Sequence, residues 1–558
     1  MHEGRPTDLT PERIGFDLKR PVAWLNPGVL LQTGAQVVTA YLFDRFLDKR
    51  ELQAVFPSTV HDHSDHDELW LDYTADAGDG FDATYSIAYL IAANRLTVSG
   101  APTELPRGDV LVLGGDQVYP AASATAYEDR WKGPYRAALP ELSQDSPTIY
   151  AIPGNHDWYD GLTAFIRLFA QNDPIGGWRT AQNRSYFALQ LPQRWWMFAL
   201  DIQLDAYIDE PQLEYFRTIR DSVGPDDRII LAVARPAWTM LDTFPAAYDS
   251  IDYFVRTVIN RDGDGPSIPL ILAGDKHHYS RYAQQRGDVH PRTLVTCGGA
   301  GAYLSDTAAL PDEVTVPSPE THSRHSTEPR RFTKAQTYPT GSEAHRLSWQ
   351  VFWRLPWRNR GFVAMLGFLQ TMLMLALLSV DGWGFNAQVG FAVAAILIGT
   401  VAFAVLMGHR GLRNWVAGIL HAVPHFFLGV GGTAVWMALP FVDTPPVFAL
   451  LLALVLYLPV IGLLDTWVLC AYLIVARLFG VNDNEIFAGM GIDDYKSFLR
   501  MHIAADGTLT IYPIAVDDVA RRWRANPNAP AHAPWIVPAD AQAPAPRLAE
   551  PPIVIKPE

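Results

Sequence analysis

Four long apolar runs between residues 361 and 480 limit most strongly what this chain can fold into. The runs at 362–380 and 389–407 each have the length of a helix that crosses a bilayer, and the run at 415–442 is similar in character. The fourth run, 447–480, is longer than one simple span and short for two. The sequence therefore predicts an α-helical transmembrane domain with about four spans.

Basic residues beside these runs predict the orientation of the spans. They are Arg354, Arg358 and Arg360 before the first run, and Arg410 and Arg413 between the second and third. The loops 381–388 and 443–446 contain no Lys or Arg, so the positive-inside rule places the N-terminal part inside. Four spans return the C-terminus inside, whereas five would place it outside. Residues 1–20 lack the apolar core of a signal peptide, and we expect an inner-membrane protein with a cytoplasmic N-terminal part.

Length, charge and cysteine content narrow the class of protein. A chain of 558 residues is long for one domain, and two or three are expected. The net charge of −15 argues against a protein that binds nucleic acid through phosphate contacts. Two cysteines, Cys297 and Cys470, cannot form a disulfide framework, which fits a reducing compartment.

The region before the spans alternates between short β-branched runs and longer mixed segments. Six of the runs are predicted strands that end in glycine or polar residues: 108–120, 147–161, 195–205, 228–238, 269–279 and 292–304. This pattern predicts an α/β sandwich with polar residues at the strand ends, where open α/β sheets place their sites.

The remaining segments complete the predicted domain organisation. The boundaries are a helical N-terminal extension at 1–68, the α/β domain at 69–316, a polar linker with a membrane-interface segment at 317–360, the spans at 361–480, a small β-containing segment at 481–525, and a Pro/Ala-rich, disordered tail at 526–558. The β-containing segment is predicted to be a hairpin that turns at Asp506-Gly507.

Polar side chains with metal-binding chemistry follow the predicted strands. TADAGDG supplies Asp76, GGDQVY supplies Asp116 and Tyr119, PGNHDW supplies Asn155 and His156, and GDKHHY supplies Asp275 and His277. Oxygen ligands combined with imidazoles suit Fe, Mn or Zn better than a thiolate site would. Two such ions can clamp a phosphoryl group and generate hydroxide at neutral pH.

Together these motifs resemble the calcineurin-like metallophosphoesterase superfamily. The likeness is to a membrane-attached branch with ADTGDG-, GGDxxYP-, PGNHDWxDGL- and GDxHHY-type motifs, and it covers about 69–304. The stretches FTKAQTYP and YKSFLRMHI…LTIYPI also look like bacterial members. The resemblance implies a two-metal α/β sandwich that hydrolyses phosphate esters.

Motif position then implies a role for each residue. Asp76 is a terminal ligand of the first metal, Asp116 bridges, Asn155 binds the second metal, His156 contacts the phosphate or protonates the leaving group, His277 completes the first metal, and Tyr119 matches the tyrosinate of purple acid phosphatases.

Three departures from the family pattern concern the predicted site, and one of them is Leu304-Ser305-Asp306, where relatives tend to carry histidine. Asp275 stands where most relatives have the first histidine of a Gly-His-any-His motif, and a carboxylate can replace that imidazole. Ala234 stands where the fourth motif usually offers a histidine, so we expect the second site to be weak or water-filled. Arg235 beside it is expected either to supply positive charge to a phosphate or to cap a strand end.

Three further residues lie inside the motifs. Asp157 is expected to orient ligands through hydrogen bonds rather than to bind metal. Asp79 and His278 are open between that role and metal binding. Within the apolar runs, Asp465, His421 and His425 are ionisable, which marks them as functional residues or as polar contacts that stabilise the bundle.

The leading hypothesis is a membrane-anchored metallophosphoesterase with a phosphate-ester substrate. Closeness to the bilayer favours a lipid-linked phosphate, although soluble nucleotides stay open. The alternative is a degenerate domain that binds a ligand or partner and acts as a membrane-bound sensor. A third interpretation makes the spans a channel or transporter that the α/β domain regulates.

Overall fold

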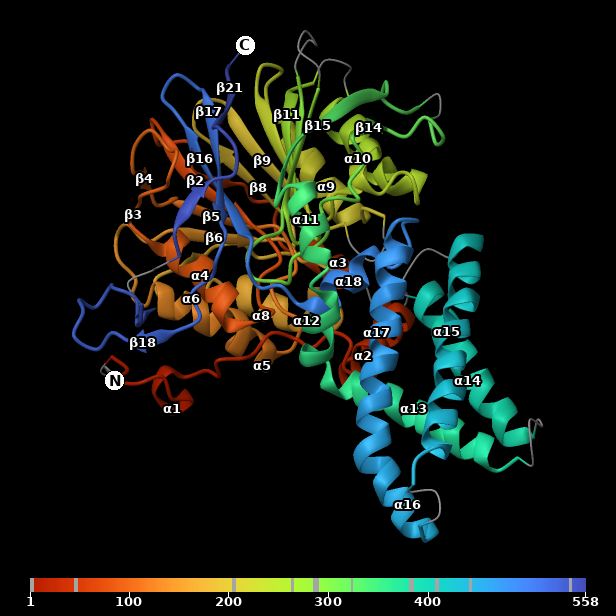
Figure 1. Cartoon of the computed structure of the whole chain (residues 1–558). Coiled ribbons are helices and arrows are strands. Elements are labelled where there is room, and N and C mark those ends of the chain that lie inside the picture. Colours follow the sequence, from red (N-terminus) through yellow and green to blue (C-terminus); the bar gives the residue numbers. More distant parts are fainter. Residues whose placement is uncertain are drawn as a thin grey trace. The chain divides into compact units, whose positions relative to one another are not determined.

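The computed structural model describes residues 5–44, 49–202, 207–261, 265–284, 291–322, 325–380, 386–406, 411–440, 444–540 and 544–557. They form two compact units, whose elements Figure 1 labels. The α/β unit comprises Met1–Val22, Thr33–Gly341 and Asp493–Glu558, and the membrane unit comprises Ala23–Gln32 and Ser342–Ile492.

Two sheets form the centre of the α/β unit. The nine-stranded sheet has the order β1 (His61–Asp62), β8 (Phe187–Leu191), β9 (Trp195–Leu200), β10 (Arg228–Val233), β11 (Ser267–Ala273), β13 (Thr293–Cys297), β12 (Tyr279–Gln284), β15 (Arg330–Tyr338), β14 (Glu313–Val316). The eight-stranded sheet has the order β20 (Pro546–Leu548), β17 (Leu509–Val516), β16 (Lys496–Ile503), β2 (Leu69–Thr74), β5 (Val110–Leu113), β6 (Thr148–Ala151), β7 (Arg179–Thr180), with β21 (Ile553–Ile555) paired to β17. All six segments predicted to be strands contain one.

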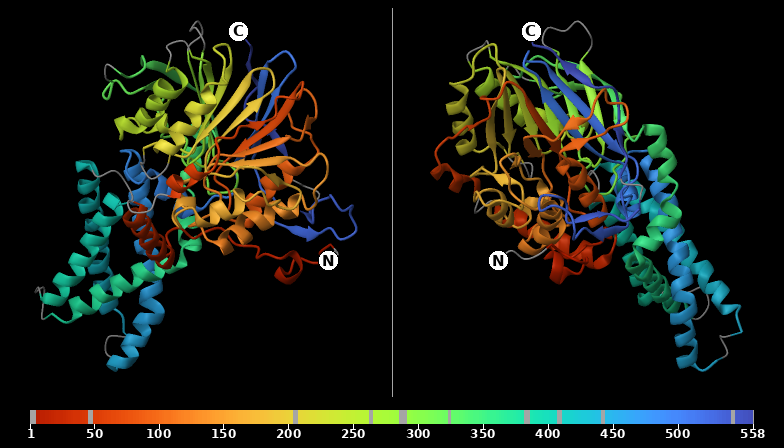
Figure 2. Two further views of the ribbon diagram at one scale, coloured as in Figure 1. Left: turned by 180° about the vertical axis from the view of Figure 1, so that it is seen from behind. Right: turned by 90° about the vertical axis from the view of Figure 1, so that its left-hand side faces the viewer.

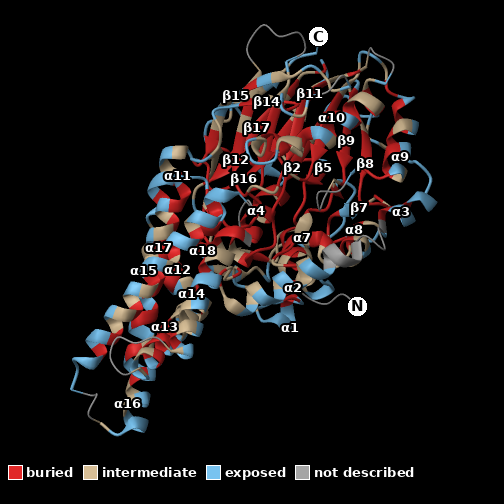
Figure 3. Ribbon diagram, turned by 90° about the vertical axis from the view of Figure 1, so that its right-hand side faces the viewer, coloured by how far each residue is buried: buried red, intermediate tan, exposed pale blue. Residues whose placement is uncertain are grey.

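Apolar side chains between the two sheets hold them together. Leu71 and Val112 of the eight-stranded sheet share one buried cluster with Met197, Ile230 and Leu272 of the nine-stranded sheet. Helices α4 (Phe81–Ala92), α6 (Gly133–Ala138) and α8 (Thr163–Phe169) cover the outer face of the former, and α9 (Glu210–Arg220) and α10 (Asp249–Phe254) that of the latter. Figure 3 shows the strands buried almost throughout. The predicted α/β class is confirmed.

The C-terminal hairpin completes the eight-stranded sheet. β16 pairs antiparallel with β2, with Leu499 opposite Tyr73 and Ile503 opposite Leu69. Figure 2 shows these blue and orange-red strands side by side in both views. The turn between β16 and β17 contains Gly507 at φ 82°, a conformation that glycine adopts without strain. Segments on either side of the spans in sequence therefore share one sheet.

The predicted linker and the predicted disordered tail are both wrong in part. Residues 330–338, placed in the linker, form β15, because Phe332 is fully buried in the core on that strand. The Pro/Ala-rich tail forms β20 and β21 on β17, and β19 (Ile536–Pro538) pairs with β18 (Trp523–Ala525). Proline is tolerated in edge strands, and the guanidinium of Arg5 donates to four backbone carbonyls between residues 530 and 534, which gives this segment tertiary partners.

Within its described residues, the membrane unit contains four helices that are long and apolar enough to cross a bilayer. They are α13 (Arg360–Leu378), α14 (Ala387–Leu406), α15 (Leu412–Met437) and the stretch Pro446–Arg477, which combines α16 (Pro446–Leu452), the π-helical turn η6 (Ala453–Tyr457) and α17 (Leu458–Arg477). The predicted four helices are confirmed, and the long fourth run is one helix of 32 residues. Large apolar side chains on these helices are exposed, Phe391 at 79% and Phe427 at 65%, as expected of a surface that lipid covers.

Two glycines let α13 and α17 approach closely, and the first prediction concerns them. A Cβ on Gly367 would lie 2.3 Å from the carbonyl oxygen of Leu458 and 3.2 Å from Cα of Gly462. Gly367→Leu should therefore destabilise the membrane unit by about 1–3 kcal/mol, measured as thermal unfolding in detergent. Gly431→Leu is the matched control, because a Cβ on Gly431 of α15 has nothing within 4 Å. Equal melting temperatures of the two variants would contradict the close packing.

Candidate functional site

The predicted site residues follow parallel strands and meet at their carboxyl ends. β2, β5 and β6 run parallel in one sheet, and β9, β10, β11 and β13 in the other. A Cβ on Gly154, after β6, would meet the carboxylate of Asp116 at 2.0 Å, and one on Gly298, after β13, would meet that of Asp76 at 1.9 Å. A Cβ on Gly115 would lie 3.2 Å from Cβ of Ala234, after β10. The backbone of one motif loop therefore lies directly against the predicted site residues of another.

Three motif aspartates adopt an uncommon backbone conformation. Asp76, Asp116 and Asp275 have φ of 61°, 50° and 64°, in the left-handed region. Non-glycine residues are rare there, and such residues gather at functional sites. The conformation is held by backbone hydrogen bonds, since the N–H of Asp76 donates to the carbonyl of Gly115 and that of Ala77 to the carbonyl of Asp116, each at 3.0 Å.

Tyr119 lies at the centre of the first set of predicted ligands. Its Oη is 3.0 Å from Nε2 of His277, 3.3 Å from Oδ2 of Asp116 and 3.4 Å from Oδ1 of Asp76. The backbone N–H of Asp275 donates to the same Oδ1 of Asp76 at 3.1 Å. The structure thus brings together the four residues assigned to the first metal, with Asp275 adjacent.

Burial and neighbouring charges of the same sign shift the pKa values of Asp76, Asp116 and His277. Burial, together with Asp116 and Asp275, raises the pKa of Asp76 far above its usual range. Burial, and then Asp275, raises the pKa of Asp116 to about 8. Burial lowers the pKa of His277, and the charge of Lys496 lowers it further. Buried titratable groups whose pKa values are shifted by burial and by neighbouring charges are characteristic of functional sites.

We tested whether these residues suit a metal. In the described ranges no group of three or more His, Cys, Asp and Glu side chains is spaced to hold an ion. The donor types do fit, because Oδ2 of Asp76 and Nδ1 of His277 are buried and make no hydrogen bond within the described part of the chain. The separations of 3.0–3.4 Å around Tyr119 also match those between ligands bound about 2.0–2.2 Å from one ion.

The second predicted ligand set is less complete. The amide Nδ2 of Asn155 donates to Oη of Tyr159 at 2.8 Å, which fixes the orientation of its side chain. Asp275 is half-buried, and its charge raises the pKa of both Asp76 and Asp116. Ala234 occupies the histidine position and has no donor atom. Arg235 follows it and is half-buried.

Two hydrogen bonds, one from the backbone of His156 and one from its ring, fix the orientation of its side chain. Its backbone N–H donates to Oδ1 of Asp116 at 2.8 Å, and its ring Nδ1 lies 2.7 Å from the carbonyl oxygen of Pro120. A carbonyl only accepts, so Nδ1 carries the proton and Nε2 the lone pair. Burial lowers the pKa of His156 to about 4, which keeps the ring neutral at pH 7.

The remaining motif residues fall into two kinds. Asp79 accepts hydrogen bonds from the backbones of Val22 and Tyr303, and Asp157 accepts from the backbones of Gly154 and Gln117. Both carboxylates thus hold loops. His278 is buried, burial lowers its pKa to about 3, and its ring nitrogens have no hydrogen-bond partner among the described residues.

Sequence reasoning missed Lys496, the first residue of β16. Its side chain is fully buried, and Nζ makes no hydrogen bond within the described residues. The next residue, Ser497, donates its N–H to the carbonyl of Gly299 at 3.1 Å, which holds the lysine beside the loop that covers Asp76. Burial lowers its pKa to about 8, and the carboxylates of Asp493 and Asp494, followed by those of Asp79 and Asp76, raise it again in part. Only the pairing of β16 with β2 brings this lysine to the site, so no spacing in the sequence indicates it.

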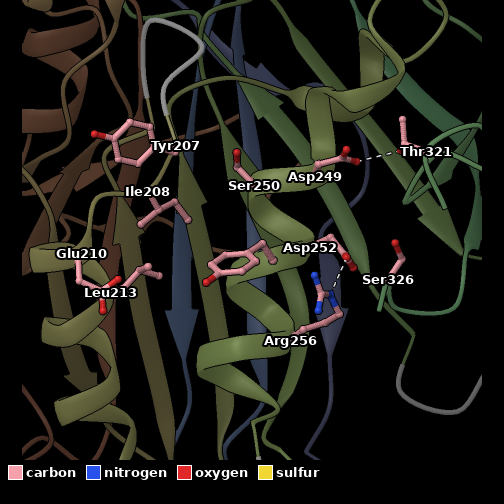
Figure 4. Close-up of a pocket in the computed structure, with 11 residues that line it drawn as sticks. Tyr207, Ile208, Glu210, Leu213, Asp249, Ser250, Asp252, Arg256, Thr321 and Ser326 are labelled. Atoms are coloured by element: carbon pink, nitrogen blue, oxygen red, sulfur yellow. Dashed lines mark hydrogen bonds and ion pairs between the residues drawn. The ribbon is translucent and has the colours of Figure 1, made fainter. Parts of the chain in front are cut away.

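A separate pocket lies on the outer side of the nine-stranded sheet (Figure 4). Asp249, Asp252 and Glu210 line it with a single arginine, Arg256, whose Nε is 3.0 Å from Oδ2 of Asp252. None of the motif residues lines it. Its acidic lining is unfavourable for an anionic phosphate ester.

Comparison with known proteins finds only partial or distant likeness. No family model matches the chain. Two precorrin-4 C(11)-methyltransferases of Mycobacterium tuberculosis, from strains CDC 1551 / Oshkosh and ATCC 25618 / H37Rv, are each 33% identical over 98 residues, or 17% of this chain and 37% of theirs. The chain thus spans about a third of the length of the curated relatives it matches.

Two solved structures show a distant likeness to the chain. GAP50, the anchor in the inner membrane complex of Plasmodium, is 11% identical with a TM-score of 0.30, over 47% of this chain and 78% of that one. The structure of PhoD is 10% identical with a TM-score of 0.29, over 50% of this chain and 65% of that one. These likenesses are too distant to assign a family.

Proposed function

We propose that the α/β unit is a metal-dependent hydrolase of phosphate esters, of the metallophosphoesterase type, that the apolar helices anchor in a membrane. The observation that carries the proposal is the position of Tyr119, whose Oη lies 3.0–3.4 Å from His277, Asp116 and Asp76 at the carboxyl ends of the strands. Three aspartates in left-handed backbone and an unpartnered carboxylate oxygen support it.

The proposed ligand sets follow from the donors that the loops present. Asp76, Asp116, Tyr119 and His277 would hold the first ion. Asp116, Asn155 and Asp275 would hold the second, more weakly because Ala234 has no donor. When bound, Fe, Mn or Zn would supply Lewis-acid stabilisation and lower the pKa of a coordinated water.

The chain's own residues would bind the phosphate and handle protons. His156 is held with its Nδ1–H on Pro120, so its Nε2 can accept a proton or a hydrogen bond. Its pKa of about 4 must rise when an anionic ester binds before the ring can protonate a leaving group. Arg235 and Lys496 are the cations expected to neutralise phosphate oxygens.

The apolar helices give this hydrolase a location. We propose that the α/β unit faces the cytoplasm from the inner membrane, on the charges that flank the spans. A site held near the bilayer favours a lipid-linked phosphate ester. The net charge of −15 makes nucleic acid an unfavourable partner.

The alternative is a membrane-bound sensor that binds a phosphorylated ligand without turnover. The sensor is favoured by Ala234, whose side chain has no atom that can bind a metal. One experiment distinguishes the hydrolase from the sensor. Purified full-length protein is tested for metal content and for hydrolysis of lipid-linked and soluble phosphate esters. About two metals per chain with turnover supports the hydrolase. Bound metal with no turnover on any ester supports the sensor and contradicts the hydrolase.

Lys496→Met is expected to raise the KM for the ester about tenfold or more, because a buried charge-assisted contact to phosphate is lost. The effect should fade as pH rises above about 8, where burial lets the native ammonium lose its proton. The measurement is KM and inhibition by inorganic phosphate as functions of pH. Lys334→Met is the matched control, because Lys334 lies on β15 and pairs with Asp312. Equal KM values for the two variants would remove Lys496 from the site.

A further inference from the structure

A chain of polar side chains lies buried within the membrane unit. Nδ1 of His425 on α15 is 2.6 Å from Oδ1 of Asp465 on α17, and its Nε2 is 2.8 Å from Nε2 of His421. Gln370 of α13 donates from Nε2 to the same Asp465 oxygen at 2.9 Å. All four side chains are at least 96% buried. Nothing in the proposed phosphoesterase uses them.

The hydrogen bonds among these side chains all donate in one direction, toward Asp465. An ionised Asp465 only accepts, so His425 donates from Nδ1 and presents the lone pair of Nε2. His421 must then donate from its own Nε2, which leaves its Nδ1 as a lone pair. That Nδ1 is buried and makes no hydrogen bond among the described residues. The chain therefore ends in a base without a proton.

We propose that Asp465, His425 and His421 form an intramembrane proton-binding relay with its open end at Nδ1 of His421. A proton that adds at this Nδ1 lets His421 pass its Nε2 proton to Nε2 of His425. His425 then passes its Nδ1 proton to the carboxylate of Asp465. One proton is gained, both imidazoles stay neutral with reversed tautomers, and the carboxylate becomes a neutral acid.

Few charged or titratable side chains lie near the relay on the described elements. An ionised carboxylate without a counter-ion is costly in the apolar interior of a bilayer. The described part of α14, Ala387–Leu406, has no charged residue. Tyr457 of η6, Cys470 and Tyr472 of α17, and Glu485 of α18 (Asp483–Met490) are the other titratable groups near the relay among the described residues. Arg360, Arg413 and Arg477 lie at helix ends.

A proton fits this geometry better than a metal ion. Two donors bound to one Zn²⁺ at about 2.0–2.1 Å lie more than about 3 Å apart. The donor pairs here are 2.6 and 2.8 Å apart, which are hydrogen-bond lengths.

Polar groups continue from the open end of the relay toward the end of α17. The ring of His421 stacks on Tyr472 with centroids 3.6 Å apart. Oη of Tyr472 donates to Asn482 at 2.8 Å, and Asn482 donates to Glu485 of α18 (Asp483–Met490) at 3.2 Å. These contacts lead from the ring of His421 to α18, which lies outside the apolar segment.

Solid-state ¹⁵N NMR of full-length protein tests the relay. The protein is labelled at histidine, reconstituted in lipid, and recorded between about pH 5 and about pH 9, the range in which histidines titrate. His421→Gln and His425→Gln assign the two signals among the 16 histidines. In the wild type we expect both rings to reverse their tautomers at one shared midpoint.

Two variants decide between a relay and a static polar contact. Asp465→Asn should abolish the shared midpoint, and His425→Gln should abolish the response of His421 while leaving Asp465 in place. Thr466→Val is the control, because Thr466 only bonds its own helix at Gly462, and it should behave as the wild type. Rings that keep one tautomer throughout, in the wild type and in Asp465→Asn alike, would overturn the proposal. Because no metal takes part, this result is independent of phosphoesterase activity.

Discussion

Asp116→Asn is expected to lower phosphate ester hydrolysis by at least about 100-fold. Groups that merely orient metal ligands cost about 10–100-fold when changed, and Asp116 is assigned as the shared ligand of both ions. The backbone N–H of His156 also donates to Oδ1 of Asp116. The substitution therefore disturbs both the proposed metal ligand and the position of His156. Steady-state kinetics with metal content measured on the same sample checks the prediction.

The same variant should fold more stably without metal. The pKa of Asp116 is raised from 3.8 to about 8, so the folded protein binds this proton more tightly than the unfolded chain does. The contribution of Asp116 to the free energy of unfolding is therefore fully present below about pH 4 and is lost as the pH rises to about 8. Asparagine cannot ionise, and Asp116→Asn should melt higher than the wild type at pH 8, with a smaller difference at pH 5.

Asp201→Asn is the matched control for the activity measurement. Asp201 is a fully buried carboxylate at the end of β9, and burial raises its pKa to about 7. It accepts a hydrogen bond from Trp158 and belongs to neither ligand set. Its activity should stay within a few-fold of the wild type. Comparable activity of Asp116→Asn and the wild type would contradict the proposed site.

Arg500→Met is expected to destabilise the α/β unit by about 3–5 kcal/mol, because it leaves a buried carboxylate unpaired. Nε and a terminal nitrogen of Arg500 on β16 are 2.7 and 2.9 Å from the two carboxylate oxygens of Asp72 on β2. Both side chains are at least 98% buried. Burial raises the pKa of Asp72 although Arg500 lowers it, which shows how costly the lone carboxylate would be.

The double variant Asp72→Val/Arg500→Met should recover most of that loss, since replacing a buried ion pair with apolar residues is often neutral. Urea unfolding of the full chain measures both variants. A single-variant loss below about 1 kcal/mol would show that β16 is not held to β2 through this pair.

Periodicity and local motifs were sufficient for much of the architecture. The apolar run 228–238 contains the strand Arg228–Val233, because β-branched residues favour a buried, pleated backbone. The run 362–380 lies almost entirely in the helix Arg360–Leu378, because a helix satisfies the backbone hydrogen bonds of a long apolar segment internally. The hairpin around Gly507 followed from turn chemistry. The tail was mispredicted, because its strands exist only where β17 and β18 offer an edge to pair with.

The sequence by itself determined which residues follow which strands, and hence that Asp76, Asp116 and His277 are available to one site. It also determined that the apolar region forms membrane-length helices, because length and hydropathy are local properties. Only the tertiary structure decided that Lys496 joins them from the far side of the spans and that Asp465 meets two histidines. Such contacts depend on strand pairing and helix packing between residues far apart in the chain, and no local pattern encodes them.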